Sequence, residues 1–160
     1  MDTYRAVVIT VSDRISRGVG EDRSGPAAVK QLNELGFVCT SALIADGIVE
    51  VETAIRQALA SDPALIVTTG GTGMSPRDLT PEGTSRVIER PVPGFSEAMR
   101  SATFGTNPHG MLSRGVCGIA GRTLIVNLPG SVSGVEESMQ VVAPALPHAV
   151  ELLRSGESKH

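Results

Sequence analysis

Residues 65–81 read LIVTTGGTGMSPRDLTP. The first five residues are apolar or β-branched, and such a run is typical of a strand buried on both faces of a parallel sheet. The run leads directly into Gly70–Gly73, the densest glycine cluster in the chain, and glycines allow successive backbone N–H groups to turn toward an anion. The stretch therefore predicts a buried strand followed by a phosphate-binding loop, although a plain strand-to-helix turn would have the same pattern.

Strand and helix patterns alternate on both sides of this loop, which predicts an α/β fold with right-handed crossovers. We expect residues 1–160 to form a single domain, a three-layer α/β/α sandwich with a mostly parallel sheet, and residues 156–160 to form a frayed tail. The predicted strands are residues 6–11, 37–45, 65–69 and two strands within 118–128 that turn at Gly121-Arg122. The first two predicted helices are residues 26–35 and 48–60. A third begins at an N-cap at Thr80 with Pro81 and reaches about Arg90, and a fourth runs through Met99. A C-terminal helical stretch begins at a capping box at Ser133 and Glu136 and is interrupted near Pro144 and Pro147.

Composition limits the classes of partner. The chain has 160 residues, a net charge of −3, one Tyr and three Phe, and its basic residues form no cluster beyond Arg14 and Arg17. Proteins that bind nucleic acid generally carry a basic patch, often with aromatic residues on which bases stack, so we do not expect nucleic acid as a main partner. The first apolar stretch has six residues, too few for a signal peptide or a membrane span, which favours a cytoplasmic protein with no membrane partner.

Other common chemistries lack a sequence pattern. Cys39 and Cys117 form no C-x-x-C pair, and we expect both to be buried, reduced thiols. The three histidines, at positions 109, 148 and 160, lack the spacing of zinc ligands, and no G-x-S-x-G nucleophile elbow is present. The glycine loop matches neither the P-loop nor the G-x-G-x-x-G dinucleotide motif.

Four loops follow the predicted strands, at residues 12–24, 45–47, 70–80 and 129–133. Because the carboxyl ends of parallel strands meet at one edge of a sheet, ligands bind there in open α/β folds, and we expect these loops to converge. A basic residue beside an acid, as at Arg77-Asp78, suits phosphate and Mg²⁺, and Asp46 could face Asp78 across a pocket. A surface ion pair and an ordinary Asp-Gly turn are the alternatives for these positions, and Ser12, Asp13 and Ser131 could equally be caps or turn residues.

The run TGGTGMSPRDLTPE at residues 69–82 resembles the signature of molybdenum-cofactor biosynthesis proteins of the Mog and MoaB type. The resemblance covers nearly the whole chain. It includes TVSD at 10–13 with Gly18, Asp22 and Ser24-Gly25, PGF at 93–95 with Glu97 and Arg100, Ser113-Arg114, and NLPG at 127–130.

This resemblance implies a homotrimer that uses molybdopterin as substrate, ATP as co-substrate and Mg²⁺ as cofactor. The implied reaction is adenylyl transfer, in which the terminal phosphate of molybdopterin attacks the α-phosphorus of ATP and releases pyrophosphate. Asp46 and Asp78 match the family's two essential acids, which would act in catalysis and support Mg²⁺. The nucleotide-pocket positions are Ser12, Asp13, Gly70, Gly71, Thr72 and Gly73, and the substrate-binding positions are Arg77, Ser113, Arg114, Pro129, Gly130 and Ser131.

Two other functions stay open at this point. A non-catalytic relative could bind a pterin or act as an assembly scaffold, and a related domain suggests a nucleotide pyrophosphatase. The resemblance also suggests the molybdate-inserting enzyme as a partner, because some family members are fused to it. Three positions depart from the commonest family pattern. Ser96 and Gly83 replace frequent small residues, and Gly47 follows Asp46 where a second acid is frequent, which leaves the orientation of Asp46 open.

Overall fold

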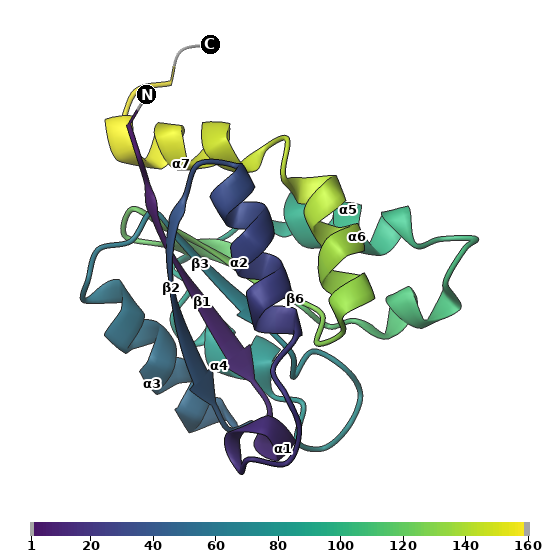
Figure 1. Ribbon diagram of the computed structural model, residues 1–160. Helices are drawn as coiled ribbons and strands as arrows, with labels where there is room; N and C mark the ends of the chain where they lie inside the picture. Colours follow the sequence, from purple (N-terminus) through teal and green to yellow (C-terminus); the bar gives the residue numbers. More distant parts are fainter. Residues whose placement is uncertain (1, 159–160) are drawn as a thin grey trace.

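A six-stranded sheet forms the centre of the computed structural model, which describes residues 2–158 (Figure 1). The strands are β1 (Arg5–Val11), β2 (Val38–Ile44), β3 (Leu65–Thr69), β4 (Arg90–Pro91), β5 (Cys117–Ala120) and β6 (Thr123–Leu128). Their order is β2-β1-β3-β6-β5-β4, in which β2, β1, β3 and β6 are mutually parallel and β5 is antiparallel to both of its neighbours. The mostly parallel α/β sheet expected from the sequence is confirmed.

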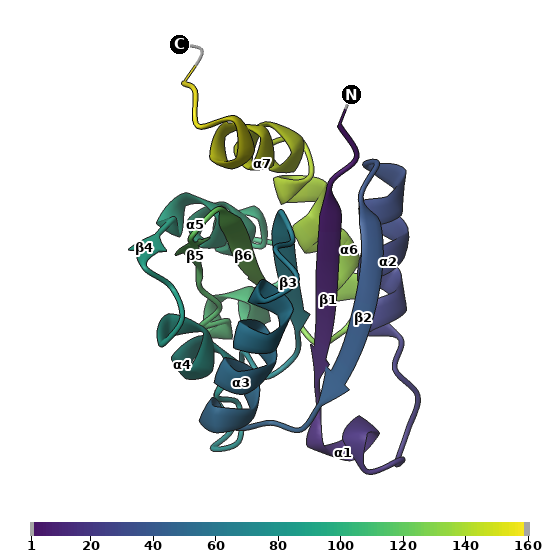
Figure 2. The same cartoon turned by 90° about the vertical axis from the view of Figure 1, so that its left-hand side faces the viewer.

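Helices cover both faces of this sheet: Figure 2 shows the strands side by side, with helices in front of them and behind them. They are α1 (Asp13–Ser16), α2 (Ser24–Glu34), α3 (Ile48–Leu59), α4 (Thr80–Ser85), α5 (Pro93–Ala102), a 3₁₀ segment (Pro108–Leu112), α6 (Val132–Val142) and α7 (Leu146–Ser155). The α2 and α6 helices pack together on one face, while α3 and α4 pack together on the other. The three layers are therefore helix, sheet and helix.

The buried strands carry apolar residues on both faces because each face has its own hydrophobic core. In β3, Leu65 and Val67 belong to the core under α2 and α6, and Ile66 belongs to the core under α3. The same alternation occurs in β1 and β6. Burying one such side chain contributes roughly 1.5–3 kcal/mol, so these strands provide a rigid base for the loops that follow them.

The segment around Thr80 differs from its prediction. Helix α4 has Leu79 as its N-cap residue, and the hydroxyl of Thr80 instead donates a hydrogen bond to the carbonyl of Gly70 at 2.9 Å. The helix ends at Ser85, well before Arg90, because residues 90 and 91 form the short strand β4 beside β5. Tertiary pairing with the sheet therefore overrides the helical pattern predicted to reach Arg90.

Helix boundaries elsewhere also differ from the predicted ones. Ser131, not Ser133, caps α6, since its hydroxyl accepts a hydrogen bond from the Gly134 N–H at 3.0 Å. The prolines predicted to interrupt the C-terminal stretch lie where α6 ends and α7 begins. Helix α2 starts two residues before Pro26, and the short α1 lies in a segment predicted as loop.

The C-terminal residues and the two cysteines agree with their predictions in part. Residues 156–158 lie outside any helix, whereas residues 159–160 of the predicted frayed tail lie outside the described part of the chain. Cys117 is buried and Cys39 is only half-buried, and neither forms a disulfide, so burial was predicted correctly for one thiol. Across residues 2–158, no helix combines the length and apolar character needed to cross a membrane.

Candidate nucleotide and pterin site

A cavity of about 240 Å³ lies at the carboxyl edge of the parallel strands. Six predicted site residues line it, and they come from all four of the loops expected to meet there: Ser12, Asp46, Gly70, Gly71, Asp78 and Gly130. The predicted convergence of these loops is therefore confirmed, and Asp46 and Asp78 do share one cavity.

Asp46 is the most enclosed acid of this cavity, with 9% of its surface exposed. Its carboxylate accepts a hydrogen bond from the Asp13 N–H at 2.8 Å, and its own N–H donates to the Asp13 carboxylate at 3.1 Å. This reciprocal pair fixes the orientation that Gly47 left open in the sequence. Burial, with the neighbouring charges of Asp13 and Asp78, raises the pKa of Asp46 above its ordinary value.

Arg77 binds protein groups in this structure. Its guanidinium donates to both carboxylate oxygens of Asp13, at 3.0 and 3.1 Å, and to the backbone carbonyl of Asp46 at 2.7 Å. The hydrogen bond from Arg77 lowers the pKa of Asp13 below its ordinary value. Neither Asp13 nor Arg77 lines the cavity, so the pair acts as a tie between loop 12–24 and loop 70–80.

Asp78 closes a tight turn at residues 75–78, within loop 70–80. Its carboxylate accepts from the Ser75 N–H at 3.0 Å, and its N–H donates to the Ser75 carbonyl at 2.9 Å. The guanidinium of Arg114 donates to the carbonyls of Gly73, at 2.8 Å, and Asp78, at 2.6 Å. It also pairs with the carboxylate of Glu82 on α4, and this hydrogen bond lowers the pKa of Glu82.

The glycines of the loop allow the close approach of several groups. A Cβ on Gly71 would stand 2.2 Å from the Thr80 hydroxyl and 3.0 Å from a carboxylate oxygen of Asp46. Gly70 and Gly71 line the cavity, whereas Thr72 and Gly73 do not. The loop therefore brings the backbone against the ligand space at its first two glycines only.

Helix N-termini face the same edge. Ser24, the first residue of α2, lines the cavity, and α6 begins just after Gly130. Because the N-terminus of an α-helix carries a partial positive charge, two of them at one edge favour a bound anion. This is the source of positive potential that the lining side chains lack, since their only charged members are Asp46 and Asp78.

Three hydroxyl residues of the cavity were missed as site residues: Thr10, Ser24 and Thr69. The hydroxyls of Ser24 and Thr69 lie 3.0 Å apart, and Thr10 donates to the Asp22 carboxylate at 2.8 Å. All three stand at a strand end or a helix start, which was the signal that could have identified them. Residue types that also serve routinely as caps carry this signal only weakly.

A second, smaller hollow of about 50 Å³ lies beside the first. Ser113 and Pro129 line it, together with Arg100 of α5 and the buried Asn127. The Arg100 guanidinium donates to the Gly115 carbonyl at 3.0 Å. The Pro129-Gly130 turn borders both hollows, while neither Arg114 nor Ser131 lines either of them.

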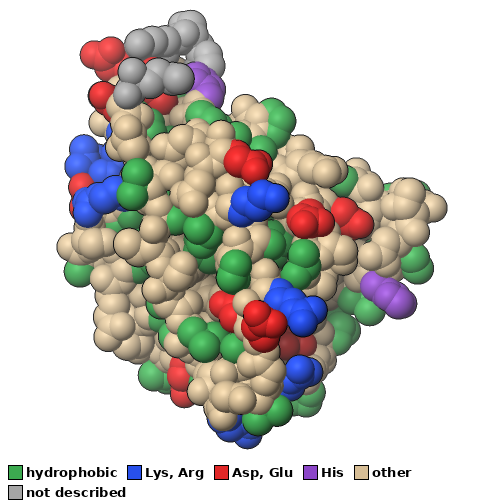
Figure 3. Space-filling model, in the orientation of Figure 1, with side chains coloured by type: hydrophobic (Ala, Val, Ile, Leu, Met, Phe, Trp, Pro, Cys, Tyr) green, Lys and Arg blue, Asp and Glu red, His purple; other side chains and the backbone are tan. Residues whose placement is uncertain are grey.

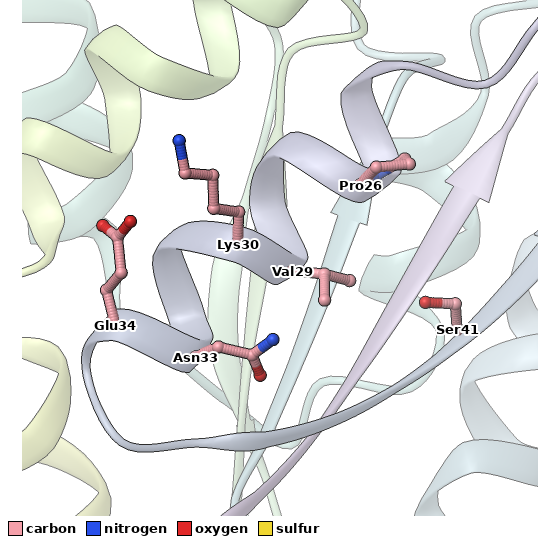
Figure 4. Close-up of a pocket in the computed structure, with 6 residues that line it drawn as sticks. All are labelled: Pro26, Val29, Lys30, Asn33, Glu34 and Ser41. Atoms are coloured by element: carbon pink, nitrogen blue, oxygen red, sulfur yellow. The ribbon is translucent and has the colours of Figure 1, made fainter.

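Other concavities contain none of the predicted site residues. One lies between α2 and the edge strand β2, where Figure 4 draws Lys30, Glu34 and Ser41 among its lining residues. Another, of about 740 Å³, lies at the opposite end of the sheet, near Tyr4 and Phe37. On the face in Figure 3, acidic and basic side chains lie beside one another. Convergence of polar groups, and not volume, therefore singles out the strand-end cavity.

The residues present fit a magnesium ion with a phosphorylated ligand. The described residues contain no group of three or more His, Cys, Asp or Glu side chains that could hold a metal by themselves. Mg²⁺ is usually held by one or two carboxylates together with substrate phosphates and water, so two acids in one cavity suffice. Fold and cavity together define an α/β protein with a polar cavity at its strand ends that suits an anionic ligand bound with a cation.

Comparison with known proteins agrees with this class. The family described as a probable molybdopterin binding domain matches residues 7–148. The chain therefore belongs to the molybdopterin-binding domain family of the Mog and MoaB type.

Individual relatives differ in how much of their length the chain covers. The chain is 37% identical to a molybdopterin adenylyltransferase of Helicobacter pylori, over 96% of this chain and 89% of that protein. It is 41% identical to gephyrin of Dictyostelium discoideum, but spans only 22% of that longer protein. The structure of the molybdopterin biosynthesis enzyme MoaB from Thermus thermophilus superimposes with a TM-score of 0.90 and 39% identity, over 99% of this chain and all of that one.

Proposed function

We propose that this protein is a molybdopterin adenylyltransferase that transfers the adenylyl group of ATP to molybdopterin during molybdenum cofactor biosynthesis. The observation that carries the proposal is the strand-end cavity, whose only charged side chains are the acids Asp46 and Asp78. Two acids alone repel a polyphosphate, so this cavity suits a nucleotide that arrives with a divalent cation. Two relatives that match more than nine tenths of this chain bear the name of this enzyme.

Asp46 and Asp78 would hold Mg²⁺, which would neutralise phosphate charge during the reaction. The nucleotide phosphates would lie against Gly70 and Gly71 and the start of α2. We assign the substrate phosphate to the small hollow, which is lined by Ser113 and the cationic Arg100. The shared Pro129-Gly130 turn would then bring the two reacting phosphates together.

The reaction proposed for this site needs no general base. A phosphate monoester carries close to two negative charges near pH 7, so an oxygen of the pterin phosphate is itself the nucleophile. It forms a bond to the α-phosphorus as the bond to the bridging oxygen of the β-phosphate breaks, and pyrophosphate leaves with the electron pair. The residues therefore act by holding two anions in line and by offsetting their charge.

The test is transfer of label from ATP to the pterin. With purified protein, molybdopterin and Mg²⁺ under anaerobic conditions, label from the α-phosphate of ATP should appear in the pterin and label from the γ-phosphate in pyrophosphate. The control omits the pterin. Pyrophosphate released equally well without pterin would indicate a nucleotide pyrophosphatase, and tight pterin binding with no product would indicate a non-catalytic relative.

The assembly of the protein belongs to the same proposal. We infer a homotrimer from the resemblance to the Mog and MoaB family. We also infer a partnership with the molybdate-inserting enzyme, since the adenylylated product would be the substrate of the later metal-insertion step. Sedimentation of the purified chain would test the first of these and co-purification would test the second.

A further inference from the structure

We propose that Arg114 is a positioning residue that fixes Asp78 in the nucleotide cavity, and that it does not bind the substrate. This inference rests on the proposed function and changes the role that the family resemblance implies for Arg114. Four hydrogen bonds of its guanidinium carry the inference, and all of them go to residues 73–82.

The hydrogen bonds of Arg114 bracket Asp78 on both sides. Its Nε donates to the Gly73 carbonyl at 2.8 Å, and its Nη2 donates to the carbonyl of Asp78 itself at 2.6 Å. The carboxylate of Glu82, on α4, pairs with the same guanidinium. The backbone N–H of Arg114 donates to the Thr72 carbonyl at 2.8 Å, so backbone and side chain together hold one side of the loop.

The loop has a particular need for such a tie. Residues 74–77 are exposed, and Asp78 reaches the cavity from this exposed turn. Arg77 holds the opposite side of the turn through Asp13 and Asp46. Arg114 supplies the corresponding tie toward α4. A guanidinium suits this task because it is planar, permanently charged and able to donate to several acceptors in a fixed geometry.

The placement of Arg114 argues against direct contact with substrate. Its side chain lines neither the strand-end cavity nor the small hollow, whereas its neighbour Ser113 does line the hollow. Its attraction for Glu82 further stabilises the guanidinium where it is, and the hydrogen bond to Glu82 raises the pKa of Arg114. These four hydrogen bonds leave only one of the five guanidinium N–H groups of Arg114 for a substrate phosphate.

The experiment is a double-mutant cycle between Arg114→Gln and Asp78→Asn, read in the label-transfer assay. Arg114→Gln alone should lower kcat/KM by about 10- to 100-fold, since displacing a catalytic group by about 1 Å can reduce the rate by up to about 100-fold. The variant should also need a higher Mg²⁺ concentration to reach its half-maximal rate. The KM for the pterin should change little. Glu82→Gln, which removes the charge of the partner and keeps its shape, should give a smaller effect in the same direction.

The cycle separates the two roles. If Arg114 acts through Asp78, adding Arg114→Gln to Asp78→Asn should cost less than about threefold more. Losses that multiply in full, or a pterin KM that rises in Arg114→Gln with the Mg²⁺ requirement unchanged, would overturn the inference. Arg122→Gln is the matched control, because Arg122 forms an exposed ion pair with Asp62 at the far end of the sheet.

A second readout is independent of turnover. The affinity for Mn²⁺ with ATP, measured by titration calorimetry, should fall several-fold in Arg114→Gln and stay unchanged in Arg122→Gln. Thermal melting would confirm that both variants are folded. Unchanged Mn²⁺ binding in folded Arg114→Gln would overturn the positioning role. A wild-type protein that binds Mn²⁺ with ATP but transfers no label would overturn the proposed function and leave this comparison intact.

Discussion

Asp46→Asn and Asp78→Asn should each lower the rate of adenylyl transfer to molybdopterin by roughly 100-fold or more, because each removes a carboxylate proposed to hold the Mg²⁺ that offsets phosphate charge. Both side chains line one cavity and no other charged side chain shares it. The measurement is label transfer at saturating ATP, repeated over a range of Mg²⁺ concentrations. Activity that survives in both variants would contradict the assignment of this cavity.

The stability of Asp46→Asn provides the control for this loss. Because burial raises the pKa of Asp46, the ionised carboxylate is less favourable in the folded state than in the unfolded chain. Asp46 therefore costs stability at pH values above its folded pKa, and the cost disappears as the pH falls and the group is protonated. The neutral variant should melt at least as high as the wild type near pH 7, and its advantage should shrink as the solution is acidified.

Gly70→Ala should destabilise the folded protein by roughly 2–5 kcal/mol, the sum of a left-handed backbone strain and a steric overlap. Gly70 has a φ of +92°, and a Cβ there would stand 2.3 Å from the backbone carbonyl oxygen of Val11. A backbone atom at the end of β1 has little room to move, because β1 is paired on both sides. Urea unfolding of wild type and variant measures the difference.

Gly94→Ala is the matched comparison for this substitution. Gly94 lies in α5, its φ is not positive, and a Cβ there would meet no atom within 4 Å. Alanine is favoured over glycine in a helix by up to about 1 kcal/mol, so this variant should be unchanged or slightly more stable. Equal effects of the two substitutions would show that the geometry at Gly70 is not what constrains the loop.

The sequence pattern predicted the strands better than the ends of the helices. Leu65–Thr69 is a strand over the residues predicted, because a short β-branched run before glycines leaves few alternatives. The helix predicted to reach Arg90 ends at Ser85, since the backbone around Arg90 pairs with β5, and no local pattern signals that long-range pairing. Ser131 and Ser133 both offer a cap, and only the path of the chain after β6 decides between them.

For the candidate site, the sequence likewise predicted the position of the loops but not the hydrogen-bond partners of their side chains. Convergence of the loops followed from topology alone, because parallel strands place their carboxyl ends at one edge. The partners of each side chain did not follow, since Arg77 and Arg114 each face several acceptors of similar chemistry. Hydrogen bonds between residues distant in sequence, such as those from Arg77 to Asp13, decide which cation faces a ligand and which holds a loop.

The most direct test of the proposed nucleotide and metal site is a crystal structure of the protein with a non-hydrolysable ATP analogue and Mn²⁺, whose anomalous signal locates the metal. We expect Mn²⁺ in contact with Asp46 and Asp78, and nucleotide phosphates against Gly70 and Gly71. Nucleotide bound in the concavity between α2 and β2, or Mn²⁺ away from both acids, would contradict it.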